Sequence, residues 1–167
     1  MTALETTDQA VPTDGVVLAV PPWVATDLVP GIVAPNEFQS ILNIHFRVDA
    51  APGPAGFIGV VGGTAEWIFV KPGHVSVTIS AANRMVDQPA ASIAATVWPD
   101  VRAALDLPGT MPAFRVVKER RATFAATAAQ ERLRPGPRTA LANLVLAGDR
   151  SAVIGLILDR ILQGDGT

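Results

Sequence analysis

The chain has 167 residues, of which 49% are hydrophobic and 17% are charged, and its formal net charge is −2 at pH 7. This composition supports a buried core, and it argues against intrinsic disorder and against nucleic-acid binding driven by net charge. The sequence contains no cysteine and has two histidines that lie far apart, so disulfides and thiolate chemistry are excluded and no metal site is expected.

The N-terminal residues 1–14 are polar and acidic, and we expect them to form a disordered tail. They have neither the basic start nor the apolar core of a secretion signal. No stretch of the sequence is long and apolar enough to span a bilayer. We therefore expect a cytoplasmic protein, and peripheral contact with the inner membrane stays open.

The first predicted elements are a strand and a short helix. Residues 15–20 form a brief apolar run that ends at Pro21-Pro22, as expected for a buried strand. Residues 23–28 suit one or two helical turns before Pro30-Gly31 interrupts the chain.

A sheet is predicted next. Residues 41–48 alternate between apolar and polar side chains, which is typical of a half-buried strand. Shorter strands are predicted at 57–61, 66–70 and 75–80, with glycine-containing turns between them. Together these segments predict an antiparallel meander of about four strands with one polar face.

A helix is predicted between Pro89 and Pro108. Its apolar residues recur at every fourth position on one face: Ile93, Val97, Val101 and Leu105. Pro99 falls within this pattern and is expected to kink the helix or to split it in two.

The rest of the chain supplies two strands and a helix. Residues 115–124 are a charged strand candidate, and residues 144–147 read as a short buried strand. A final helix is expected over 154–162, with Gly164 as its C-terminal cap. The whole pattern predicts an α/β chain of α+β character, in which a substrate-binding unit is inserted between pieces of a nucleotide-binding sheet.

Six strings along the chain carry a family resemblance. They are Val17-Leu18-Ala19-Val20-Pro21-Pro22-Trp23, Ile44-His45-Phe46-Arg47, Gly62-Gly63-Thr64-Ala65-Glu66-Trp67, Val75-Ser76-Val77-Thr78-Ile79-Ser80, Lys118-Glu119-Arg120-Arg121-Ala122-Thr123-Phe124 and Leu146-Ala147-Gly148-Asp149. In this order the chain resembles the hydroxysqualene dehydroxylases, which are FAD-dependent members of the amine oxidase and phytoene desaturase superfamily. The match runs from about Gly15 to Asp149, and the strings fit these proteins better than the carotenoid and phytoene desaturases.

The resemblance implies a fold, a cofactor and a reaction. It implies an antiparallel substrate-domain sheet with helices over 24–124, and remnant strands of a Rossmann-like FAD-binding domain over 15–23 and 125–167. The implied cofactor is FAD, and the implied substrate is a squalene-type isoprenoid. The implied reaction removes the hydroxyl of hydroxysqualene to give squalene, a step of squalene and hopanoid biosynthesis.

The chain departs from the family pattern in two places. It contains no Gly-x-Gly-x-x-Gly turn, which would hold a dinucleotide pyrophosphate at a helix N-terminus. After Gly148-Asp149 the family continues with Trp-Thr, whereas Arg150-Ser151 stands here. A C-terminal portion of the enzyme, a frame-altered product or a chain that needs a separate FAD-binding partner would explain both departures.

The predicted cofactor-binding residues are Gly148, Asp149, Val20 and Pro21. The resemblance places the Gly148-Asp149 pair beside the FAD, and it places Val20-Pro21 where the chain leaves the flavin domain. The alternatives are that Asp149 caps the last helix and that the prolines only end a strand.

The predicted substrate-binding residues are His45, Arg47, Trp67 and Phe69. His45 and Arg47 share one strand face, which either looks into a cavity or simply faces solvent. Trp67 and Phe69 suit the apolar wall of a terpene pocket, and ordinary core packing is the alternative that we favour. The charged run 118–121 is expected to be a solvated strand edge with a salt bridge.

Residue pattern and resemblance together leave two functions open. The first is the C-terminal portion of an FAD-dependent oxidoreductase, whose catalytic residues stay unassigned because the flavin carries the difficult step. The second is a non-catalytic lipid-binding or subunit-completing module that docks on a separate nucleotide-binding chain.

Overall fold

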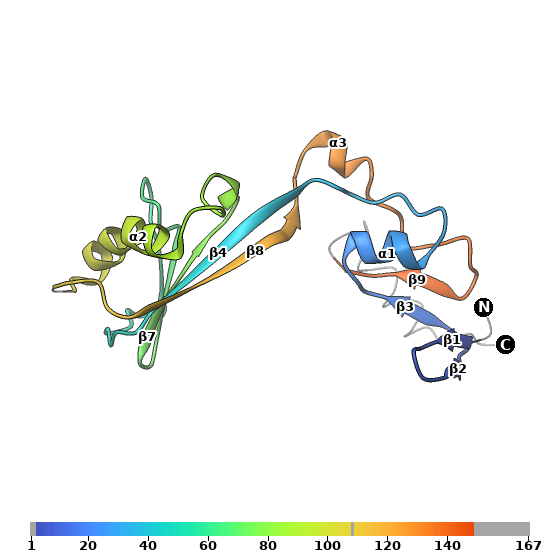
Figure 1. Ribbon diagram of the computed structural model, residues 1–167, viewed down its shortest axis with the longest axis horizontal. Helices are drawn as coiled ribbons and strands as arrows, with labels where there is room; N and C mark the ends of the chain where they lie inside the picture. Colours follow the sequence, from blue (N-terminus) through green and yellow to red (C-terminus); the bar gives the residue numbers. More distant parts are fainter. Residues whose placement is uncertain (1–2, 108, 149–167) are drawn as a thin grey trace. The chain divides into compact units, whose positions relative to one another are not determined.

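The computed structural model describes residues 3–107 and 109–148, which fall into two compact units. We call residues 38–124 the sheet unit, and we call the described parts of 1–37 and 125–167 the split unit, because it is built from two separate stretches of chain (Figure 1). The sheet unit is thus one continuous stretch of chain that interrupts the split unit in sequence.

The sheet unit is built on a five-stranded antiparallel sheet with the order β5-β6-β7-β4-β8. The strands are β4 (Phe38–Phe46), β5 (Phe57–Gly59), β6 (Trp67–Lys71), β7 (His74–Ile79) and β8 (Phe114–Phe124). The four predicted strands are confirmed, but they do not form one meander. Only β5, β6 and β7 follow each other in space, because β4 pairs with both β7 and β8 and lies between them.

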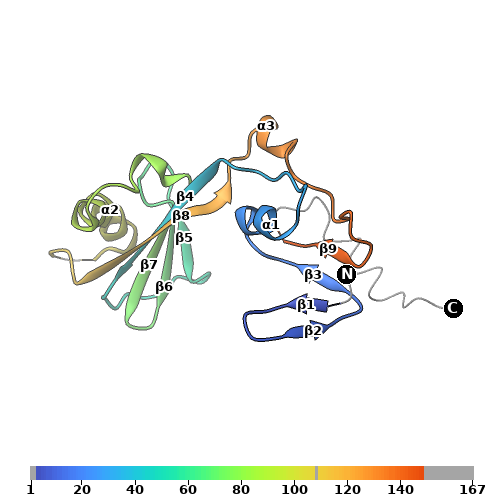
Figure 2. The same cartoon turned by 45° about the vertical axis from the view of Figure 1, so that its right-hand side comes forward.

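One helix, α2 (Ala90–Leu105), covers one face of this sheet (Figure 2). The alternation of β4 turns its even-numbered side chains toward that helix. The fully buried core therefore combines strand and helix residues, namely Leu42, Ile44, Phe46, Ile68, Val75, Val77, Ile79, Ile93, Ala94, Val97 and Val101. A short 3-10 helix, η1 (Ala82–Arg84), connects β7 to α2.

Pro99 lies inside α2 without splitting it. Its side chain is exposed, so the ring is accommodated at the solvent side of the helix, although the helix loses one backbone hydrogen bond there. The helix ends at Asp106, which adopts a left-handed conformation with φ of 50°. The amide of Leu107 then donates to the carbonyl of Arg102 at 3.0 Å.

The split unit contains a two-stranded parallel sheet of β3 (Val16–Leu18) and β9 (Leu144–Leu146). These correspond to the two short buried strands that the sequence predicts at 15–20 and 144–147. Leu144 and Leu146 pack with Val29 in a small second core. Two short helices belong to the same unit, α1 (Pro22–Leu28) and α3 (Ala128–Glu131).

The N-terminal residues differ from the expected disordered tail. Strands β1 (Ala3–Glu5) and β2 (Ala10–Pro12) pair as an antiparallel hairpin. The turn between them is closed by the hydroxyl of Thr6, which donates to the carbonyl of Gln9 at 2.8 Å and accepts from its amide at 3.1 Å. Such side-chain closure of a turn gives little signal in a short polar segment.

The boundaries of the units also differ from the expected ones at one end. The substrate-binding domain was expected to start at residue 24, but α1 belongs to the split unit and the sheet unit starts at Phe38. Its C-terminal boundary, Phe124, coincides with the expected one. The predicted helix over 154–162 and the cap at Gly164 lie outside the described residues.

Candidate functional site

The candidate site lies on the face of the sheet opposite to α2, which we call the second face. One row of directly paired residues crosses all five strands on this face, and its members are Phe57, Phe69, Ser76, His45 and Arg115. The row therefore runs from aromatic residues on β5 and β6 to basic residues on β4 and β8. Because each residue comes from a different strand, only the register of the sheet brings them together.

Three aromatic side chains gather at the β5–β6 end of the second face. The ring centroid of Phe57 lies 5.9 Å from that of Trp67 and 6.1 Å from that of Phe69. Phe57 and Trp67 remain 47% and 45% exposed. We call these three residues the aromatic cluster, and its exposed rings offer an apolar surface of the kind that binds hydrophobic ligands.

Core packing, the alternative that we favoured for Trp67 and Phe69, is wrong for Trp67. Strand alternation places Ile68 on the α2 side, where it is fully buried, and turns its two neighbours to the second face. The sequence predicts that Trp67 and Phe69 share one face of β6, but it does not predict which face of β6 the helix α2 covers.

His45 is the fourth residue of the row and lies between Ser76 and Arg115. Its Nδ1 lies 2.8 Å from the hydroxyl oxygen of Ser76, which is itself buried. Burial lowers the pKa of His45, and the positive charges of His74, Lys71 and Arg115 lower it further. His45 is therefore half-buried, and its contact with Ser76 holds the ring in place. It does not simply face solvent, which was the alternative to a cavity-lining role.

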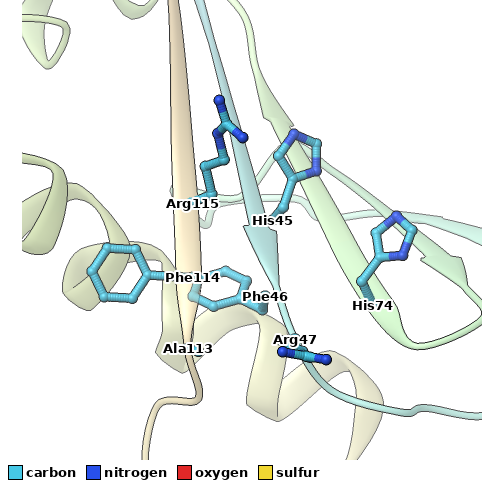
Figure 3. A pocket seen from close by; sticks show the side chains of 7 residues that line it. All are labelled: His45, Phe46, Arg47, His74, Ala113, Phe114 and Arg115. Atoms are coloured by element: carbon cyan, nitrogen blue, oxygen red, sulfur yellow. The ribbon is translucent and has the colours of Figure 1, made fainter.

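A pocket of about 250 Å³ opens beside His45 (Figure 3). It is lined by His45, Phe46, Arg47, His74, Ala113, Phe114 and Arg115. It brings two predicted site residues together, His45 and Arg47, whereas Trp67 and Phe69 do not line it. His74 and Arg115 were missed, because only the pairing of β4 with β7 and β8 places them near His45.

The predicted cofactor residues lie at one edge of the β3–β9 sheet. The two strands are parallel, so their carboxyl ends meet, and the amide of Ala147 donates to the carbonyl of Leu18 at 3.0 Å. Val20 and Pro21 follow β3 at this edge, and Gly148 follows β9 with φ of 101°. Asp149 lies outside the described residues.

This edge has the strand arrangement at which α/β sheets bind ligands. Ligands of open α/β sheets bind beyond the carboxyl ends of parallel strands, and nothing within 4 Å would meet a Cβ placed on Gly148, so a ligand has room to approach. The sequence holds no glycine-rich phosphate-binding turn. The β3–β9 edge is therefore the place in this chain where the predicted cofactor residues Val20, Pro21 and Gly148 lie near one another.

The charged run on β8 has structural partners. The ammonium group of Lys118 donates to the carbonyls of Val86 and Gln88 at 2.8 and 2.5 Å. Arg120 forms an exposed salt bridge of 2.7 Å with Asp87. The prediction of a solvated strand edge with a salt bridge is confirmed.

Residues 3–107 and 109–148 include no helix that is long and apolar enough to cross a membrane. The same residues include no group of three His, Asp or Glu side chains that could bind a metal ion.

Comparison with known proteins identifies close relatives in sequence. The chain is 48% identical over 138 residues to a hydroxysqualene dehydroxylase of Rhodopseudomonas palustris, a match that covers 83% of this chain and 33% of the relative. It is 48% identical over 141 residues to that of Sinorhizobium fredii, covering 84% of this chain and 34% of the relative. The resemblance predicted from the six strings is confirmed, and the chain spans about a third of the length of these relatives.

A solved structure agrees with the fold. A protein from Exiguobacterium sp. 255-15, described as a candidate protoporphyrinogen oxidase, superposes with a TM-score of 0.57 at 15% identity. The match covers 92% of this chain and 40% of that one, and it supports the predicted mixed α/β fold class. Residues 2–160 match the family described as flavin containing amine oxidoreductase. The chain therefore belongs to the flavin-containing amine oxidoreductase family.

Proposed function

We propose that this chain is part of an FAD-dependent oxidoreductase that converts hydroxysqualene to squalene. The observation that carries the proposal is the sequence identity of 41–48% to three hydroxysqualene dehydroxylases, over 81–84% of this chain. In this proposal the sheet unit forms the substrate-facing layer, and the split unit contributes one wall of the flavin site.

The reaction sets the tasks of the protein. Replacing a C–OH bond by a C–H bond takes two electrons and two protons, and the hydroxyl leaves as water. Reduced FAD supplies the two electrons when it is bound. The tasks left to side chains are to hold a long apolar substrate, to orient its hydroxyl and to keep water away.

The aromatic cluster suits the first task. An isoprenoid offers almost only apolar surface, and Phe57 and Trp67 present exposed rings, with Phe69 half-buried beside them, on one face of the sheet. Burying such rings against a ligand is worth roughly 25 cal/mol per Å² of apolar surface. We assign substrate contact to Trp67 and Phe69, which are two of the substrate-binding candidates in the sequence.

The centre of the row suits the second task. His45 and Ser76 lie on neighbouring strands and form a hydrogen-bonded pair next to Phe69. The pair presents a ring nitrogen and a hydroxyl that can exchange hydrogen bonds with an alcohol. We assign the substrate hydroxyl to this pair.

A chimera tests the proposal. The matched third of the Rhodopseudomonas palustris relative is replaced by residues 15–149 of this chain, and conversion of hydroxysqualene to squalene is measured by gas chromatography. We expect the chimera to bind FAD and to form squalene. A chimera that folds and binds FAD but forms no squalene would overturn the proposal.

Paired variants of the chimera test the assigned substrate wall. Replacing Trp67 and Phe69 together by Ala should raise KM for the isoprenoid about tenfold or more, since apolar contact is lost on both rings. The matched control replaces Val61 by Ala, which removes an exposed apolar side chain from the loop after β5. Equal KM values in the two variants would contradict the assigned wall.

The isolated chain tests the incomplete flavin site. Because the sequence lacks a phosphate-binding turn, the 167-residue chain alone should not bind FAD at micromolar concentration. Quenching of flavin fluorescence in a titration measures this directly. A separate chain that carries the FAD-binding half is the partner that we propose, and tight stoichiometric FAD binding by this chain alone would remove the need for it.

A further inference from the structure

The split unit buries few large apolar side chains for its length. Among its described residues, Val29, Leu144 and Leu146 form the buried core. Larger apolar side chains of the same unit are 37–63% exposed, and these are Leu4, Val11, Val17, Leu28, Val33 and Leu141. A surface with more exposed than buried large apolar side chains is typical of a region that another polypeptide covers.

Strand β3 is open on one side. Its pairing with β9 uses the amide of Val16, which donates to the carbonyl of Asn143 at 2.8 Å, and the carbonyl of Leu18, which accepts from Ala147 at 3.0 Å. Successive residues of a strand direct their backbone groups to opposite sides, so the N–H and C=O of Val17 point away from β9. Among the described strands, β9 is the one partner of β3 (Figures 1 and 2).

The other side of this two-stranded sheet is occupied. The amide of Leu146 donates to the carbonyl of Pro137 at 2.8 Å, and the hydroxyl of Thr139 donates to the carbonyl of Leu144 at 2.9 Å. The segment before β9 thus covers the outer side of β9. Within the described residues, the sheet can therefore be extended only at the open side of β3.

We infer that the open side of β3 pairs with a parallel strand from the part of the enzyme that this chain does not match. Parallel sheets are covered on both faces, and sheets of two strands are small for a folded domain. Residues 16–20 are apolar without interruption, which is typical of a strand buried on both faces and not of a solvent-exposed edge strand.

The length of the relatives supplies the partner. This chain covers 33% and 34% of the two hydroxysqualene dehydroxylases to which it is 48% identical, so most of their length lies elsewhere. The inference rests on the proposed function in one respect, since it takes the partner to be the FAD-binding part of that enzyme. It adds where this part docks, and that the docking strand is uncharged and rich in aliphatic side chains to match Val17 and its neighbours.

Co-expression tests the pairing. The 167-residue chain is produced together with an affinity-tagged fragment of the Rhodopseudomonas palustris relative, which consists of the part that this chain does not match. We expect the two to co-purify in equal amounts. Val17→Pro removes the outward N–H and leaves the bonds of Val16 and Leu18 to β9 intact, so it should weaken the complex roughly tenfold or more.

The matched control is Val17→Ala, which shortens the same side chain and keeps the amide. It should weaken the complex clearly less than Val17→Pro, because strand pairing depends on the backbone donor. Equal losses in the two variants, or no co-purification with the unmodified chain, would overturn the proposed strand pairing.

Deuterium exchange of the unmodified chain guards against a variant that fails to fold. The amide of Val17 should exchange at least about tenfold more slowly in the complex than in the chain alone. The amide of Val16, which is bonded to Asn143 in either state, should change far less. Unchanged exchange at Val17 in a purified complex would place the partner elsewhere and would overturn the inference.

Sedimentation of the chain alone separates this partner from a second copy. We expect a monomer with a rapidly exchanging Val17 amide, whereas a dimer that protects this amide would assign the open side of β3 to a second copy and contradict the inference. None of these measurements uses FAD or turnover. A complex that forms through β3 but makes no squalene would therefore refute the proposed reaction and leave the pairing intact.

Discussion

At the scale of single residues, Asp100 joins the helix to the sheet. Its Oδ2 accepts hydrogen bonds from the amides of Thr64 and Ala65 at 2.6 and 2.9 Å, and so a residue of α2 holds the loop that precedes β6. The packing leaves no room to spare, because a Cβ on Gly63 would lie 2.8 Å from the same oxygen. This contact fixes where β6 starts, and thereby where the aromatic cluster stands.

Asp100→Asn should therefore destabilise the chain. Hydrogen bonds to a charged acceptor are about twice as strong as neutral ones, so the expected loss is about 1 kcal/mol. Urea denaturation measures the free energy of unfolding. Asp106→Asn is the control, since it makes the same chemical change at an exposed left-handed position that Asn tolerates. Similar losses in both variants would show that the Asp100 contact contributes nothing.

His45 gives the chain a dependence on pH. Because its pKa is lowered in the folded state, the unfolded chain binds more protons there as the pH falls below about 6.5. Stability is therefore unaffected by His45 above that pH and is lost as the pH falls through this window toward the folded pKa.

His45→Asn should reduce this loss of stability. The measurement compares the melting temperature Tm at about pH 7.5 and about pH 5 for both chains. We expect a smaller drop in Tm for the variant, because it has no imidazole to protonate at that position. An unchanged drop would mean that His45 titrates alike in the folded and unfolded chains.

At the scale of elements, α2 carries a built-in defect. Pro99 is exposed in the interior of the helix and cannot donate a backbone hydrogen bond. Pro99→Ala restores a donor, removes the steric conflict with the preceding turn and should stabilise the chain by about 1–3 kcal/mol. Thermal unfolding measures the gain. The control Ser92→Ala, in the first turn, should change stability by no more than about 0.5 kcal/mol.

The elements show what the sequence could predict. Strict alternation predicted β4, and the fourfold spacing of apolar residues predicted α2, because both patterns record which side chains are buried. No local sequence pattern predicts that β4 lies between β7 and β8, because strand pairing depends on contacts between residues far apart in the chain. For the same reason His45 and Arg47 could be predicted as site residues, whereas His74 and Arg115 could not.

At the scale of the whole molecule, the sheet unit has the features of an independent folding unit. Its main core lies entirely within residues 38–124. Phe38 and Phe124, the residues where the chain enters and leaves, are paired in the register of β4 and β8. A chain whose ends already lie together needs little from its surroundings to close its fold.

Residues 38–124 expressed alone should therefore fold. We expect circular dichroism with both strand and helix signals and a single cooperative thermal transition. A variant with Ile44→Ala serves as the control, because losing a fully buried side chain should lower the stability by about 2–5 kcal/mol. A broad transition in the unaltered fragment would show that its core depends on the split unit.

The strand order also sets how the sheet opens. β6, β7 and β4 are each hydrogen-bonded to two neighbouring strands, whereas β5 and β8 each have one partner strand. Amide hydrogens of an inner strand are released to solvent only after one of its two ladders has separated. In deuterium exchange the amides of β7 and β4 should consequently be among the slowest of the sheet, and those of β5, a short strand at the edge, should be the fastest.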